Sequence, residues 1–176
     1  MNHLLTETHN LDSIIQDLQT KLYNDLIVAW ETTKLDAYGR VYRNERKGLV
    51  VPEVYDSTLK DYKETVYDDQ SCFFFIDDLD HPCIDLDHEF TTNVKIVFML
   101  NLKDLKTSTE RADADVKKDV VSLLEDNNYH FKINGYMSGI DNVLRGFDVS
   151  KLKSIAIDIQ PLHVFAIKTS FSYSII

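Results

Sequence analysis

Apolar residues in the first thirty positions recur at helical spacing. This spacing predicts an amphipathic helix over residues 10–30, with Asn10 as the N-cap and Trp30 closing the far end. Such an apolar stripe needs a surface to cover, and the segments that follow supply a predicted sheet. The apolar positions are Leu11, Ile14, Ile15, Leu18, Leu22 and Leu26, and the polar positions expected to face away are Asp12, Gln16, Gln19 and Asp25.

From Gly39 the pattern changes to short runs rich in aromatic and β-branched residues, which is typical of strands. Pro52 has no backbone N–H to donate to a ladder, so its run is expected at a sheet edge or in a loop. We therefore predict an arm over residues 40–55, a hairpin that projects from the body. The predicted strands in this part are Arg40–Arg43, Leu49–Tyr55, Tyr62–Tyr67 and Ser71–Asp77.

The second half of the chain has the clearest strand pattern and a second helix. Thr92–Leu102 alternates with apolar residues on both faces, which predicts a central strand. Thr107 and Glu110 form a capping box for an amphipathic helix that contains Ala112, Val116, Val120, Leu123 and Leu124 and ends at Asn127 and Asn128. The remaining predicted elements are a strand over His130–Tyr136, a helical turn over Ser138–Leu144 and a closing strand over Val164–Ile176.

Together these elements predict an α+β fold, a mostly antiparallel sheet flanked by two main helices, in one domain over residues 1–176. The chain has 176 residues, 44% hydrophobic and 27% charged, a balance that suits one core. The first residues lack the basic start and apolar run of a signal peptide, and no stretch approaches a membrane span. Cys72 and Cys83 are too few for a disulfide scaffold, so we expect a soluble protein in a reducing compartment.

Charge limits the classes of partner. With 19 basic and 29 acidic residues the net charge is −10, which repels phosphate backbones and argues against tight nucleic-acid binding. A wall that only lines a path for DNA is compatible with this charge. The segment with Arg40, Arg43, Arg46 and Lys47 reverses the sign locally, and it is either a contact for an acidic neighbouring subunit or a solvated turn.

Candidate chemistry is confined to an acidic region between residues 68 and 89. The Asp77–Asp87 cluster, with His81 or His88, suggests an alternative function, a small metal-dependent hydrolase. The spacing fits no EF-hand, however, and a solvated acidic loop is the better explanation of the cluster. No nucleophile, dinucleotide or P-loop signature is present, and Cys72 precedes three phenylalanines as a buried, inert thiol would. We therefore expect neither a catalytic site nor a cofactor.

Several stretches give the chain a familiar arrangement: "YGRVYRNERKGLVVPEVYD", "YKETVYDDQSCFFF", "NVKIVFMLNLKDL", "RADADVKKDVVSLLE", "GIDNVLRGFD" and "IDIQPLHVFAIKTSFSY". The chain resembles neck, ring or tail-completion proteins of tailed bacteriophages that infect Bacteroidetes-type bacteria, crAss-like phage ring proteins among them. The resemblance extends from about Tyr38 to Tyr173 and contains no chemical motif.

The resemblance implies a virion protein, made in the host cytoplasm, that forms a ring of six or twelve copies between portal and tail. Its partners would be the portal and other neck or tail rings, with genome DNA passing through the channel unbound and no membrane involved. A monomeric protein-binding adaptor is the remaining alternative. We expect the arm and the closing strand to form the subunit contacts, because both are expected at sheet edges. The predicted contact residues are Arg40, Tyr42, Arg43, Arg46, Val51, Val54, Tyr55, Phe171 and Tyr173.

Overall fold

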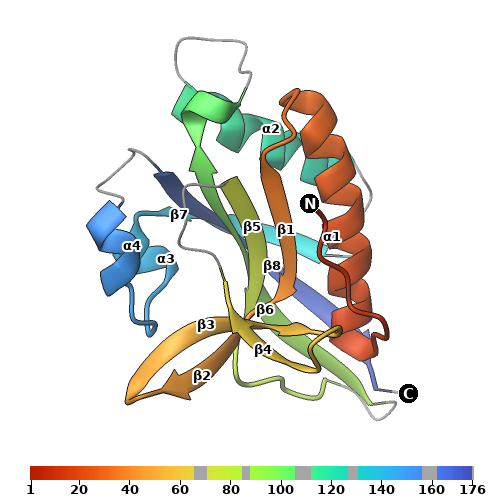
Figure 1. Cartoon of the computed structure of the whole chain (residues 1–176). Helices are drawn as coiled ribbons and strands as arrows, with labels where there is room; N and C mark the ends of the chain where they lie inside the picture. Colours follow the sequence, from red (N-terminus) through yellow and green to blue (C-terminus); the bar gives the residue numbers. More distant parts are fainter. Residues whose placement is uncertain (66–70, 85–87, 106–111, 127–130, 156–161, 176) are drawn as a thin grey trace.

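The computed structural model describes residues 1–65, 71–84, 88–105, 112–126, 131–155 and 162–175 (Figure 1). A five-stranded sheet with the order β1-β5-β6-β8-β7 forms its centre. β1 runs parallel to β5 and every other pair in this sheet is antiparallel, so the predicted α+β fold with a mostly antiparallel sheet is confirmed. The strands are β1 (Leu35–Arg40), β5 (Ser71–Asp77), β6 (Glu89–Asn101), β7 (Phe131–Ser138) and β8 (Leu162–Ser174).

Both faces of the central sheet are covered. The two main helices, α1 (Asn10–Ala29) and α2 (Ala112–Asp126), pack on one face, and the short helices α3 (Ile140–Val143) and α4 (Ser150–Ile155) pack on the other (Figure 1). A 3₁₀ turn, η1 (Leu102–Asp104), follows β6. No helix among the described ranges has the length and apolar character needed to cross a bilayer.

The alternation along β6 divides the core in two. Ile96 and Phe98 point toward α1 and α2, whereas Val97 and Met99 point toward α3 and α4. Phe98 stacks between Phe73 and Phe165, with ring centroids 5.6 and 4.9 Å away. Each fully buried phenylalanine contributes about 2 kcal/mol through burial alone. β6 is the third of five strands, so the prediction of a central strand here is confirmed.

Helix α1 departs from its prediction at three polar residues, one of which is Asp12, expected to face away but paired with Arg40 of β1. Asn10 is the first helical residue, not the N-cap; His9 is the N-cap, and it makes no side-chain capping bond. Gln19 does not face solvent but is 1% exposed. Its Nε2 lies within donating distance of Asn2 Oδ1 at 2.7 Å and of the carbonyls of His3 and Ala37 at 2.8 and 3.0 Å, so the buried N–H groups of this amide have partners.

The arm is a separate three-stranded antiparallel sheet, residues 42–64, that projects beside the body (Figure 1). It consists of β2 (Tyr42–Arg46), β3 (Leu49–Asp56) and β4 (Asp61–Glu64). Pro52 therefore lies in the middle strand, and the expectation of an edge is wrong. The carbonyl of Pro52 accepts from the amide of Thr65 at 3.0 Å, just past the end of β4. The nitrogen and the carbonyl of one strand residue point to the same side, so the nitrogen of Pro52 faces away from β2. The missing N–H therefore removes no hydrogen bond between β2 and β3.

Two further expectations about strands are corrected. β1 was not predicted, because its sequence LDAYGR lacks the dense β-branched and aromatic pattern of the other strands. β8 lies between β6 and β7, so the closing strand is an interior strand and not a sheet edge. The predicted positions Tyr67, Thr107, Glu110, Asn127, Asn128, His130 and Ile176, and the acidic residues Asp68, Asp69, Asp85 and Asp87, lie outside the described residues.

Candidate functional site

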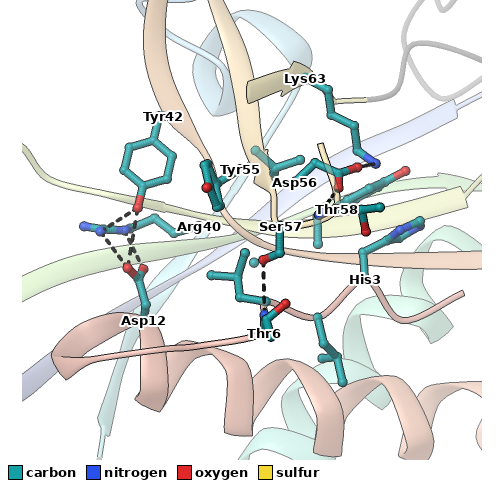
Figure 2. Close-up of a pocket in the computed structure, with 15 residues that line it drawn as sticks. His3, Thr6, Asp12, Arg40, Tyr42, Tyr55, Asp56, Ser57, Thr58 and Lys63 are labelled. Atoms are coloured by element: carbon teal, nitrogen blue, oxygen red, sulfur yellow. Dashed lines mark hydrogen bonds and ion pairs between the residues drawn. The ribbon is translucent and has the colours of Figure 1, made fainter. Parts of the chain in front are cut away.

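A cavity of about 240 Å³ lies at the base of the arm, where the arm meets the body (Figure 2). Its walls come from the N-terminal residues 3–6, the start of α1, the end of β1 and the β3–β4 turn. The site therefore exists only because β1 leads directly into the arm while α1 packs beneath both. Its labelled polar side chains include Asp12, Arg40, Tyr42, Asp56 and Lys63.

Arg40 is the centre of the polar network in this cavity (Figure 2). Its guanidinium pairs with Asp12 at two points, Nε–Oδ1 at 2.8 Å and Nη2–Oδ2 at 3.0 Å, and donates from Nη1 to Asp77 Oδ2 at 3.0 Å. Nη2 also donates to the Tyr42 hydroxyl at 2.8 Å. Burial opposes the charged guanidinium, but Asp12, Tyr42 and Asp77 outweigh it and raise the pKa of Arg40. Arg40 thus joins α1, β1, β2 and β5.

His81 extends the network beyond the sheet. Its Nε2 lies 3.1 Å from Asp77 Oδ2 and 2.7 Å from the carbonyl oxygen of Asp78, and both partners only accept, so Nε2 carries a proton. Its Nδ1 lies 2.6 Å from the Tyr173 hydroxyl. Burial raises the pKa of Tyr173, so this hydroxyl stays protonated at neutral pH. A second cavity of about 290 Å³ opens between this network and Arg43.

The opposite wall of the first cavity is held by the β3–β4 turn. Lys63 Nζ pairs with Asp56 Oδ2 at 2.7 Å, while Asp56 Oδ1 accepts from the amides of Thr58 and Leu59. The bond from Lys63, followed by the one from Leu59, lowers the pKa of Asp56. Ser57 Oγ accepts from the amide of Thr6 at 3.1 Å and so ties the turn to the N-terminal segment. The charged groups of the cavity are engaged with one another.

His3 gives the same region a dependence on pH. Its ring stacks on Tyr38 at 4.4 Å, and burial lowers its pKa from the ordinary 6.5 despite the nearby Asp36. As the pH falls, His3 therefore takes up a proton in the unfolded chain before it does so in the folded protein. The free energy of unfolding falls below about pH 6.5 and levels off once the pH is below the pKa of His3 in the folded protein.

We expect His3→Phe, which keeps the stack, to flatten this dependence in urea unfolding between pH 5 and 7. The exposed His9→Gln is the control and should retain it; an unchanged slope in His3→Phe would contradict the assignment.

The predicted contact residues of the arm divide into buried and exposed positions. Val51 and Val54 are 8% and 5% exposed and pack inside the monomer. Tyr42 is half-buried in the Arg40 network, and Arg43 donates to the Asp77 carbonyl at 3.3 Å with its guanidinium over the Phe147 ring. The exposed members are Arg46 and Tyr55.

Arg46, although exposed, has a partner within the arm. Its Nε and Nη2 donate to Glu53 at 2.8 and 3.0 Å, and Asn44 donates to the same carboxylate at 2.7 Å. The bond from Arg46 lowers the pKa of the buried Glu53. Charge reversal at Arg46 would therefore disturb the arm itself before it reported on any partner.

The closing strand offers less surface than expected. Phe171 is 2% exposed and stacks on Phe131 inside the core, and Tyr173 is half-buried against His81 and Phe90. A period-two apolar pattern identifies a covered face, but it does not distinguish cover by the same chain from cover by another.

The alternative of a metal-dependent hydrolase places a metal ion among Asp77, its acidic neighbours and His81 or His88. The structure brings Asp77 and His81 together, but the third charged group beside them is Arg40. A cation in that place repels a metal ion. No group of three His, Cys, Asp or Glu side chains suited to a metal ion occurs within the described ranges, which omit Asp85 and Asp87. Cys72 is buried in β5, as its apolar neighbours predict.

Sequence reasoning identified Arg40 and Tyr42 and grouped Asp77 with His81, but it missed the part that Asp12 and His3 play beside Arg40. These residues lie in elements far apart along the chain, and no local pattern connects them. Comparisons of the chain with protein-family models, with curated proteins and with solved structures find no match.

Proposed function

We propose that the chain is a structural subunit that assembles with copies of itself into a ring in the neck or tail of a tailed-phage virion. The ring would lie between portal and tail and surround the path of the genome. The observation that carries the proposal is the projecting arm, which holds exposed apolar side chains at both of its turns. The resemblance to neck and ring proteins supplies the biological setting.

Both ends of the arm expose large apolar groups. Leu49, beside the β2–β3 turn, is 51% exposed, and Leu59, in the β3–β4 turn, is 66% exposed. Tyr55 and Tyr62 form an exposed edge-to-face pair with ring centroids 5.4 Å apart. Covering such groups contributes about 1.5–3 kcal/mol for each large side chain, and aromatic anchors of this kind are enriched in protein interfaces.

The chemistry of the cavity supports a structural role. Arg40 and Lys63, the two strong cations of its wall, are each held by carboxylates of the same wall. Arg40 connects Tyr42 of the arm to α1 and β5, and the Thr6–Ser57 bond ties the β3–β4 turn to the N-terminal segment, so both hold the arm at a set angle to the body. A rigid arm binds a neighbour with less loss of conformational entropy than a loose one.

The arm makes a direct prediction for assembly. We expect the wild-type chain to form rings of six or twelve copies by light scattering and negative-stain imaging, and Leu49→Asp/Leu59→Asp to weaken assembly at least tenfold, because two apolar contacts become charged. The melting temperature should change little, since both side chains are exposed in the monomer.

Leu79→Asp is the matched control, because Leu79 is 83% exposed but lies in the loop after β5, outside the arm. It should assemble like the wild type. Normal rings from the arm variant would remove the arm from the contact, and a wild-type chain that stays monomeric even with the portal protein would contradict the ring and favour the adaptor.

A further inference from the structure

Cations from five separate parts of the chain gather on the face of the central sheet that carries α3. Lys95 on β6 lies directly opposite Lys168 on β8. Lys132 on β7 pairs with Ser170, two residues from Lys168, so it shares the same face. Arg43 and Arg145 both act on Lys95 through their charge. We call these five residues the basic face.

The basic face is costly for the monomer. Lys95 is half-buried, its Nζ donates to the Val143 carbonyl at 2.9 Å, and burial followed by the charge of Arg43 lowers its pKa. Lys168, its cross-strand partner, is exposed. Like charges directly opposite each other on neighbouring strands destabilise a sheet. The repulsion among these cations lowers the stability of the monomer, although the chain has a net charge of −10. Features that lower stability in this way are typical of binding surfaces.

The other side of the molecule has the opposite sign. Helices α1 and α2, which cover the far face of the sheet, carry eight carboxylates and three lysines. Asp17, Glu125 and Asp126 are exposed members of this set. We call the outer surface of the two helices the acidic layer. Helices α1 and α3 lie on opposite faces of the sheet (Figure 1). The charge of the chain is thus separated across the sheet, with the basic face on the α3 side and the acidic layer on the α1 side.

We propose that the basic face of one copy binds the acidic layer of the next copy, as a head-to-tail contact that repeats from subunit to subunit. The inference rests on the proposed self-assembly and names the surfaces that carry it. Two different surfaces in contact give a heterologous interface, which generates a ring when the rotation closes. Opposite charges across such an interface raise the association rate and exclude wrong orientations.

A second copy suits the basic face better than DNA does. DNA would have to approach a chain of net charge −10, and Asp78 lies beside Lys95 on this face. A neighbouring copy presents carboxylates on a surface of fixed shape, and much of its negative charge lies on the acidic layer that would face these cations.

Charge reversal on each surface tests the contact. We expect Lys132→Glu/Lys168→Glu to weaken self-association at least tenfold in light scattering, and Glu125→Lys/Asp126→Lys to do the same. An equal mixture of the two variants should recover the ring, because an altered basic face then meets an altered acidic layer. Raising the salt from about 0.1 M to 1 M should weaken the wild-type ring as well.

Two measurements separate the contact from a folding effect. Lys168→Glu places a carboxylate opposite Lys95, so its melting temperature should rise while its assembly falls, a combination that simple misfolding does not give. Lys103→Glu makes the same change in charge at an exposed lysine after β6, outside the basic face and the acidic layer, and it should assemble normally.

The outcomes separate this contact from the proposed ring. Normal assembly of both charge variants, with loss in the arm variant, would overturn the contact and leave the ring standing. A wild-type chain that is monomeric at concentrations on the order of 1 mM, both alone and with the portal protein, would overturn both. Binding of duplex DNA that disappears in Lys132→Glu/Lys168→Glu, while the mass of the protein is unchanged, would replace the second copy by DNA as the occupant.

Discussion

Arg40→Met is expected to lower the free energy of unfolding by about 3 kcal/mol, because it leaves two partly buried carboxylates without their cation. Side chains of Asp12 and Asp77 are 23% and 12% exposed, so water replaces the guanidinium poorly. Methionine keeps most of the apolar stem in place, which restricts the change to the charge. Urea unfolding followed by circular dichroism measures the loss.

Arg40→Lys is the matched variant. A lysine retains the charge but cannot pair with Asp12 at two points and reach Asp77 at the same time, so we expect a loss between those of the wild type and Arg40→Met. The arm should also become more mobile in both variants, visible as faster amide exchange in β2 and β3. A loss below about 1 kcal/mol in Arg40→Met would show that the network contributes no more than a surface ion pair.

Trp30→Ala should cost about 4 kcal/mol, the largest effect we expect from one substitution. Trp30 is fully buried just after α1, and its Nε1 donates to Asp119 Oδ2 on α2 at 3.0 Å. Removing the ring opens a cavity between the two main helices and takes away the bond that joins them. Thermal unfolding of the variant gives the size of the effect.

Trp30→Phe and Val28→Ala serve as controls for this prediction. Phe keeps most of the apolar volume and loses the indole N–H, so its cost should be smaller, about 1–2 kcal/mol. Val28 lies two residues away and is 74% exposed, so its truncation should leave the unfolding midpoint unchanged. Equal losses in Trp30→Ala and Val28→Ala would mean that the position along the helix matters and burial does not.

The long elements could be predicted because packing and local pattern agree in them. Leu11, Ile15, Leu18 and Leu22 repeat at helical spacing and are all buried against the sheet. Val94, Ile96 and Phe98 alternate along β6 because that strand has helices on one face and a second core on the other. In such segments the spacing of apolar residues indicates both the secondary structure and the face that is buried.

The sheet order and the site could not be predicted, because they depend on contacts between distant residues. Nothing near Arg40 in the sequence indicates Asp12 or Asp77 as partners. Phe171 was expected in a subunit contact since its strand is apolar on one face, and only the order β6-β8-β7 shows that the same chain covers it. The basic face could not be predicted for a similar reason, because its cations are spread from Arg43 to Lys168 within a strongly acidic chain.

The interior position of β8 bears on how the protein is made. The β6–β8 ladder joins Asn101 to Leu162 at one end and Glu89 to Ser174 at the other, so its partners are separated by 61 to 85 positions. Pairing at such distance folds slowly, since a long loop must close before any contact is gained. β6 and β7 have no shared neighbour until residues 162–174 have left the ribosome. A nascent chain therefore leaves the edges of β6 and β7 that pair with β8 open until the last part of its synthesis, and open strand edges of this kind favour aggregation.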